Sequence, residues 1–293
     1  MVVARTEALS GHAAMLLFAA LISVSFTLGD LAAPYIEPSV LTTARFALAV
    51  VIMGALAAPK IKKEHVRKAW RYPVVGGLLA GYFILMFEAL RLTDPVSTGA
   101  VFTLTPIMSA IFGYLLLRQI TSVRTLLALL LAAAGAIWVI FRADLDAMLG
   151  LELGFGEKIF LIGCACHALY TPMSRKLHQG EPLTVYTFFG ITGGLLVAAA
   201  YANHVLLDTD WATLPWIAWI CIIYLGLATT AVTFFLVQYA TLRLPSAKVM
   251  AYGYLVPVFI IIWEGLLGHG WVDPVVWLGA VATSGAMLML LRE

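Results

Sequence analysis

Apolar residues fill this chain in long runs, and polar residues gather in the short stretches that separate the runs. A helix needs roughly 20 apolar residues to cross the hydrocarbon core of a bilayer. Ten runs approach this length, so the pattern predicts ten membrane-spanning helices, joined by connections too short to hold a soluble domain. The predicted spans are residues 15–33, 40–58, 73–92, 96–117, 126–141, 159–177, 183–201, 216–242, 247–267 and 275–291.

One pattern occurs twice along the chain. Residues 88–117 and 239–267 each hold an apolar run, a short polar turn and a second apolar run with an internal proline, at Pro106 and Pro257. Five spans in each half would place the second half upside down relative to the first. Inverted repeats of this kind are typical of secondary transporters, whose solute site lies near the middle of the membrane. We therefore predict an all-α membrane protein of two inverted five-helix repeats, residues 1–147 and 148–293.

Lysine and arginine are unevenly distributed between the two sides of the predicted spans. Cytoplasmic loops of membrane proteins carry an excess of these residues. With the N-terminus in the cytoplasm, 14 of the 18 fall in cytoplasmic segments, three fall on the other side and Arg45 lies within the second span. Both termini are therefore expected in the cytoplasm. No small-residue cleavage site follows the first apolar run, so we interpret that run as a span and not as a cleaved signal.

Composition excludes several classes of protein. The chain is 62% hydrophobic and 12% charged, with a mean hydropathy of +0.96, whereas soluble domains are about one-quarter charged. A net charge of +2 is too small to predict a nucleic-acid partner. Of the three cysteines, Cys164 and Cys166 lie inside an apolar run, without the spacing of a zinc site, and we interpret them as packing residues. We expect no cofactor and no metal.

Polar and aromatic side chains inside the spans are the candidates for binding a solute. Aromatic faces, hydroxyls and a thioether suit an apolar or aromatic solute with a polar head. Gly77 and Gly81, four residues apart, predict a close helix approach beside this site. Pro106 and Pro257 each remove a backbone hydrogen bond, which predicts either a static kink or a gating bend. The candidate binding residues are Ser23, Tyr82, Met86, Thr103, His167, Tyr170, Thr229, Thr233, Tyr252 and Tyr254.

Charged residues inside the spans are few. Asp30, Glu88 and Glu264 fall in the outer thirds of their spans, and a proton relay needs an acid nearer the middle. We therefore expect facilitated transport without obligatory proton coupling. Arg45 is expected to extend toward the membrane interface, with Asp30 as a possible partner, in a structural role. His167 is the one histidine that lies deep in a predicted span.

Six short phrases are distinctive: Arg45-Phe46, Ala89-Leu90-Arg91, Gly113-Tyr114-Leu115-Leu116-Leu117, Ala168-Leu169-Tyr170-Thr171, Tyr224-Leu225-Gly226-Leu227 and Leu244-Pro245-Ser246-Ala247. Together they resemble the drug/metabolite transporter superfamily, in its EamA-type branch of ten-span carriers. The overall pattern is most similar to the YddG-type exporters of aromatic amino acids. Two positions depart from the EamA pattern: Arg118-Gln119 and His269-Gly270 stand where a Gly-Glu pair is usual, and Ser23 and His167 stand where a Trp-Gly or Trp-Ala step is common.

The resemblance implies a function: export of small metabolites, aromatic or other neutral amino acids among them, from the cytoplasm across the bacterial inner membrane by alternating access. The partners implied are the solute and the lipid bilayer, and the oligomeric state stays open, with a monomer as one possibility. The alternative is a nucleotide-sugar or phosphometabolite exchanger, which would need a basic pocket for phosphate. An intramembrane enzyme is not expected, because no nucleophile–base pair or metal-ligand motif stands within a span. A purely structural protein would not need matched polar faces in an inverted repeat.

Overall fold

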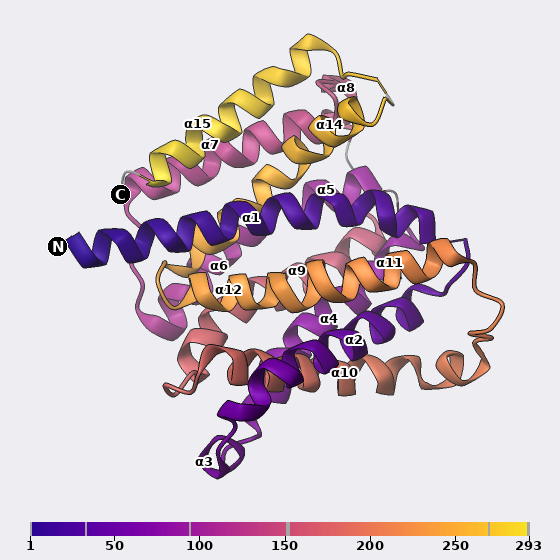
Figure 1. Ribbon diagram of the computed structural model, residues 1–293. Helices are drawn as coiled ribbons and strands as arrows, with labels where there is room; N and C mark the ends of the chain where they lie inside the picture. The colour runs from indigo at the N-terminus through magenta and orange to yellow at the C-terminus, as the bar shows by residue number, and fades with distance from the viewer. Residues whose placement is uncertain (1, 33, 94, 151–152, 269, 292–293) are drawn as a thin grey trace.

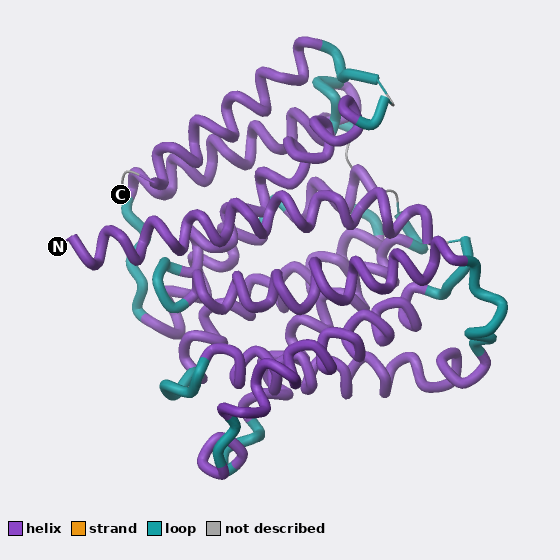
Figure 2. The backbone as a smooth tube through the Cα atoms, in the orientation of Figure 1, coloured by secondary structure: helices purple, strands orange, loops and turns teal. Residues whose placement is uncertain are grey.

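The computed structural model describes residues 2–32, 34–93, 95–150, 153–268 and 270–291, with side chains for all of these except 2–5, 25–27, 29–31 and 95–96. Every regular element in this part of the chain is a helix, as Figure 2 shows. The elements are α1 (Val2–Ala32), α2 (Pro38–Ala57), η1 (Ala58–Lys60), α3 (Lys63–Val66), α4 (Arg71–Leu90), α5 (Pro95–Phe102), α6 (Thr105–Leu117), α7 (Val123–Ile140), α8 (Leu145–Leu149), α9 (Phe155–Leu177), α10 (Leu183–Asp208), α11 (Trp216–Gly226), the π-helix η2 (Leu227–Val232), α12 (Thr233–Thr241), α13 (Ser246–Ala251), η3 (Tyr252–Leu255), α14 (Val256–Leu266), η4 (Pro274–Val276) and α15 (Trp277–Leu291).

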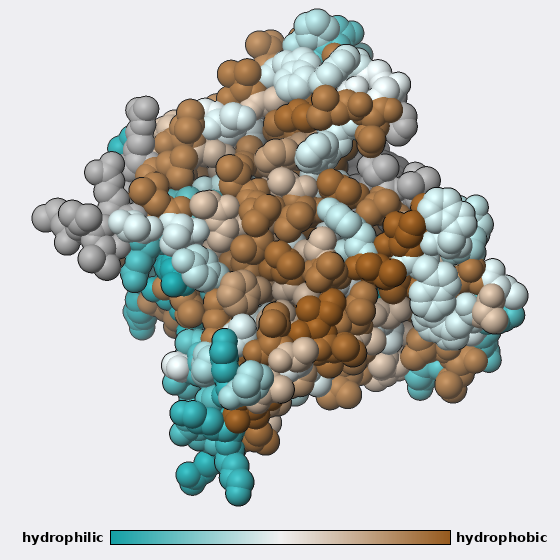
Figure 3. All heavy atoms as spheres, in the orientation of Figure 1, coloured by the Kyte–Doolittle hydropathy of each residue, from teal (hydrophilic) through white to brown (hydrophobic). Residues whose placement is uncertain are grey.

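Nine stretches of helix within the described residues are long and apolar enough to cross a membrane. Helix α9 is also long, at 23 residues, but Glu157, Lys158, Arg175 and Lys176 lie near its two ends and it is not among the nine. A multi-pass membrane protein is therefore confirmed, and a tenth span remains a prediction. Apolar side chains cover the middle of the face seen in Figure 3, and hydrophilic ones gather around α3.

Helices from the two halves of the sequence interleave. Helix α4 packs against α9 and α10, while α1 packs against α11 and α12. Helix α2 packs along α10, and α7 lies lengthwise on α15, apart from the main body of the bundle in Figure 1. The same view shows that α1 begins and α15 ends at one end of the bundle. We call the opposite end, where α4 ends and α2 begins, the far end.

The two spans with an internal proline are interrupted and not simply bent. The first is divided into α5 and α6, and the second into α13, the 3₁₀ turn η3 and α14. Pro106 and Pro257 each stand in the first turn of the new helix. A proline is tolerated there because the first backbone N–H groups of a helix have no intrahelical partner. The kink predicted for each proline is therefore a helix break that starts just before it.

Glycine allows the closest helix contact, but not at the predicted glycines. A Cβ on Gly77 or Gly81 would meet its nearest neighbour at 3.6 and 3.8 Å, which is ordinary contact. A Cβ on Gly76 would lie 2.0 Å from the carbonyl oxygen of Gly190, so α4 and α10 touch through their backbones at this point. The predicted close approach exists, but the prediction was wrong by one residue because Gly77 and Gly81 lie on a different face of α4.

Candidate functional site

An aromatic cluster lies where α4, α5 and α9 meet. The ring of Tyr82 stacks on that of His167 with centroids 4.4 Å apart and planes 19° apart. The ring of Phe102 stacks on His167 at 5.6 Å, and Phe160 lies 6.0 Å from Tyr82. Met86 packs against the same group of side chains. Tyr82, Met86 and His167 were all predicted from the sequence, and the structure brings them together with Phe102 and Phe160 in one aromatic cluster.

Polar atoms beside this cluster are buried without partners. His167 Nδ1 has no hydrogen bond to any described residue, and neither has the hydroxyl of Tyr170, one turn further along α9. Nearby hydroxyls do have partners, because those of Ser109 and Thr171 lie 3.1 Å apart and form a hydrogen bond that joins α6 to α9. A buried polar group without a partner costs about 1–3 kcal/mol. Two such atoms on successive turns of α9 are consistent with a site for a polar solute or for water.

Arg45 does not reach the membrane interface. Its side chain is only 6% exposed and turns into the protein toward the π-helix η2. Arg45 Nε donates to the hydroxyl of Thr230 at 2.9 Å, and its Nη2 donates to the carbonyl of Thr229 at 3.3 Å. The guanidinium also lies 4.3 Å from the centroid of the Phe83 ring. The expected extension to the interface was therefore wrong, and the suggested pairing with Asp30 lies outside the described side chains.

The π-helix η2 explains how the eighth predicted span, residues 216–242, accepts the side chain of Arg45. One turn of π-helix widens the backbone spiral and shifts its hydrogen bonds to longer spacing, and such turns occur often at functional sites. Within it, the hydroxyls of Thr229 and Thr230 both donate to the carbonyl of Leu225. Thr233 donates in turn to the carbonyl of Thr229 at 2.9 Å. Thr229 and Thr233, both predicted site residues, therefore form local contacts within their own helix, and Thr229 also holds Arg45.

The remaining predicted residues form separate contacts between spans. Tyr254 donates to the carbonyl of Thr103 at 2.7 Å. Ser23 accepts a hydrogen bond from Trp263 Nε1 at 2.8 Å. The hydroxyl of Tyr252 lies 2.8 Å from Nδ1 of His12. Thr103 directly follows Phe102, so the contact with Tyr254 adjoins the aromatic cluster.

His12 was missed from the sequence because the first helix is longer than its apolar run. The run was taken to begin at residue 15, whereas α1 begins at Val2, so His12 is 5% exposed within a helix. It is one of three buried histidines among the described residues, with His65 and His167. The position of His12, one turn before Met15, could have revealed it, but the first predicted span began only at residue 15.

Comparison with known proteins identifies the family to which this chain belongs. Residues 9–141 and 154–292 each match the EamA-like transporter family. The chain belongs to the EamA-like transporter family. The two matched stretches together take in most of the chain, and each contains one of the interrupted spans described above.

Individual relatives agree with this assignment. The chain is 25% identical over 252 residues to the uncharacterized transporter YyaM of Bacillus subtilis, a match that covers 84% of this chain and 82% of that one. It is 23% identical over 256 residues to the uncharacterized transporter YetK of the same organism, covering 85% and 76%. A crystal structure with 19% identity superposes with a TM-score of 0.79 over 98% of this chain and 99% of the other. That likeness shows that the EamA fold is shared.

Two members of the aromatic cluster were not predicted from the sequence. Phe160 lies seven residues before His167 on α9, so two helical turns bring both rings to one face. Phe102 is the last residue of α5, directly before the helix break. The spacing of Phe160 could have revealed it. The position of Phe102 depends on where α5 ends, which the sequence did not indicate.

Proposed function

We propose that this EamA-type transporter exports amino acids with aromatic or other neutral side chains, and related small amphipathic metabolites, by alternating access. The observation that carries the proposal is the stack of Tyr82, His167 and Phe102 with unpartnered polar atoms beside it. Aromatic rings bind an apolar or aromatic side chain, while buried hydroxyl and imidazole groups orient a polar head.

The proposal includes the arrangement in the membrane. The chain consists of two inverted halves, residues 1–147 and 148–293, with both termini in the cytoplasm of a bacterial cell and the far end outside. The interleaving of α4 with α9 and α10, and of α1 with α11 and α12, supports this division. Solute crosses between the halves, and Pro106 and Pro257 permit the interrupted spans to move.

A nucleotide sugar or phosphorylated metabolite fits less well. Such a solute carries at least two negative charges at its phosphates, and arginine forks are the usual partners of phosphate. Arg45 supplies one positive charge close to the aromatic cluster, and its guanidinium already donates to Thr229 and Thr230. One carboxylate is therefore a better match for this region than a diphosphate.

The test is counterflow in proteoliposomes that contain the purified protein and a panel of labelled amino acids, with and without a pH gradient. Exchange of aromatic and neutral amino acids is expected, and it should persist when the gradient is collapsed. Absence of exchange for every amino acid in the panel, together with exchange of a nucleotide sugar, would refute the proposal.

A further inference from the structure

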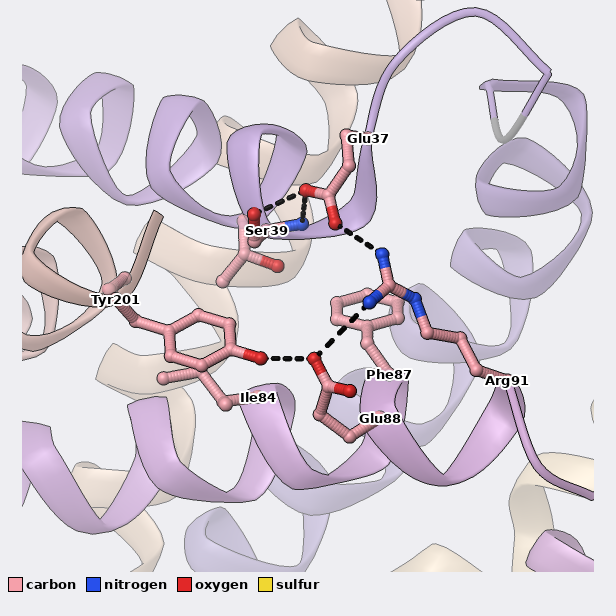
Figure 4. Close-up of a pocket in the computed structure, with 9 residues that line it drawn as sticks. Glu37, Ser39, Ile84, Phe87, Glu88, Arg91 and Tyr201 are labelled. Atoms are coloured by element: carbon pink, nitrogen blue, oxygen red, sulfur yellow. Dashed lines mark hydrogen bonds and ion pairs between the residues drawn. The ribbon is translucent and has the colours of Figure 1, made fainter. Parts of the chain in front are cut away.

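A charged network closes the bundle at its far end, between α2, α4 and α10 (Figure 4). Arg91 Nη2 lies 2.9 Å from Glu37 Oε1, and Arg91 Nη1 lies 3.6 Å from Glu88 Oε1. The hydroxyl of Tyr201 donates a short hydrogen bond to the same oxygen of Glu88. These four residues, the far-end network, line a small pocket that also includes Thr42.

The far-end network carries unequal charge. Two carboxylates share one guanidinium, so the group has a net charge of −1. The carboxylate of Glu37 is fully engaged, because its Oε2 accepts from the backbone N–H of Ser39 at 2.7 Å and caps α2. Glu88 uses only Oε1, and its Oε2 has no partner among the described residues. The network therefore keeps one carboxylate oxygen available for a further cationic donor.

A buried hydroxyl points to a ligand at the same place. Thr42 is 1% exposed, lines the pocket, and its Oγ1 has no hydrogen-bond partner among the described side chains and backbone. The pocket volume is about 10 Å³, which is room for about one water-sized group. A primary ammonium group has this size.

The network lies nearer the far end than the aromatic cluster does. Tyr82 and Glu88 are both on α4, six residues apart, which corresponds to about 9 Å along the helix. Ile84 and Phe87 line the pocket from the residues between them. On α2, Thr42 stands three residues before Arg45, one turn nearer the far end. Along both helices, the network thus lies on the far-end side of Tyr82 and Arg45.

We propose that Glu37, Glu88 and Arg91 form an exit subsite for the zwitterionic head of an amino acid, with Thr42 and Tyr201 as supporting hydroxyls. The ammonium group pairs with Glu88 and the carboxylate pairs with Arg91. Exchange of the internal ion pairs for these two pairs separates α2 from α4 and opens the far end. This proposal rests on the proposed function, since it assumes that amino acids are the solute.

Because the network holds both positive and negative groups, it favours the zwitterionic head of an amino acid over a simple ion. A metal cation would be repelled by the guanidinium of Arg91, which approaches both carboxylates. An isolated anion would be repelled by the net charge of −1. A zwitterion brings a positive and a negative group only a few atoms apart, which matches one carboxylate and one guanidinium on adjacent turns of α4.

The experiment compares three competitors of labelled phenylalanine counterflow: phenylalanine, N-acetylphenylalanine, which lacks the ammonium charge, and phenethylamine, which lacks the carboxylate. The parent protein should prefer phenylalanine. Glu88→Gln should raise the half-inhibitory concentrations of phenylalanine and phenethylamine about fivefold and leave that of N-acetylphenylalanine unchanged. Arg91→Gln should weaken phenylalanine and N-acetylphenylalanine by a similar factor and spare phenethylamine.

Glu64→Gln is the matched control, because Glu64 is an exposed carboxylate that pairs with Lys62 on α3, far from the network in sequence and in contacts. It should leave all three competitors unchanged. If Glu88→Gln and Arg91→Gln weaken all three competitors equally, the network holds the helices together without recognising the head. If the half-inhibitory concentrations do not change, the network has no role in transport. Either result overturns the subsite while the proposed function stands. A sodium-dependent shift that Glu88→Gln abolishes would assign the pocket to a cation instead. If the parent exchanges no amino acid, the proposed function fails and the subsite fails with it.

Discussion

The hydroxyl of Tyr254 donates to the backbone carbonyl of Thr103 at 2.7 Å, and each of these residues stands three positions before the proline of an interrupted span. The pattern that repeats in the sequence equates the two positions. In space they touch, at the break between α5 and α6 and within the 3₁₀ turn η3. Residues that correspond under a two-fold relationship meet where its axis passes, so this contact supports the proposed inverted halves and joins their two helix breaks.

Removal of this hydrogen bond should destabilise the protein. Tyr254→Phe keeps the ring and leaves the carbonyl of Thr103 without its donor, which is expected to lower the free energy of unfolding by about 1 kcal/mol. Thermal unfolding in detergent measures the change. Tyr114→Phe, at an exposed tyrosine of α6, is the control and should leave stability unchanged. Equal stability of the two variants would mean that the Tyr254 contact does not hold the breaks together.

Tyr82 should contribute to solute affinity. Tyr82→Ala removes the ring that stacks on His167, and an aromatic contact is worth roughly 0.5–1.5 kcal/mol beyond its buried area. The apparent affinity for an aromatic amino acid should therefore fall several-fold in counterflow assays, while the protein still inserts. Leu130→Ala, at an exposed leucine of α7, should affect stability at most. If Leu130→Ala impairs transport and Tyr82→Ala does not, the solute site lies elsewhere.

His167 offers a test that separates function from packing. His167→Phe keeps an aromatic ring against Tyr82 and Phe102 and removes the buried, unpartnered Nδ1. Because an unsatisfied polar atom costs stability, the variant should unfold at the same or a higher temperature. Transport of amino acids should nevertheless decrease, since the polar head loses a partner. Loss of stability with normal transport would show that His167 is only a packing residue.

The orientation can be measured directly. Both termini lie at one end of the bundle, and the basic residues predict that this end faces the cytoplasm. A reporter enzyme fused to the C-terminus, of a kind that is active only in the cytoplasm, should be active, and one that works only in the periplasm should be inactive. The reverse result would turn the molecule over and make the far-end network an entrance from the cytoplasm.

The sequence by itself determined the class of the protein and its repeated plan. Long apolar runs can satisfy their backbone groups in a bilayer only as helices, so ten runs predict a helical membrane protein whatever their packing. The recurrence around Pro106 and Pro257 likewise identified the two interrupted spans. The sequence predicted the ends of the helices less well. Helix α1 extends back to Val2, because polar residues can continue a helix beyond the membrane.

Only the tertiary structure decided which side chains meet. Tyr82 and His167 are 85 residues apart, and no local rule brings α4 against α9. Arg45 was expected at the membrane interface because its long side chain can extend there, yet the π-helix at Thr229 and Thr230 offers it acceptors inside the protein. A helix pattern fixes which residues share a face, but the neighbour of that face depends on how all helices pack, down to single glycines such as Gly76.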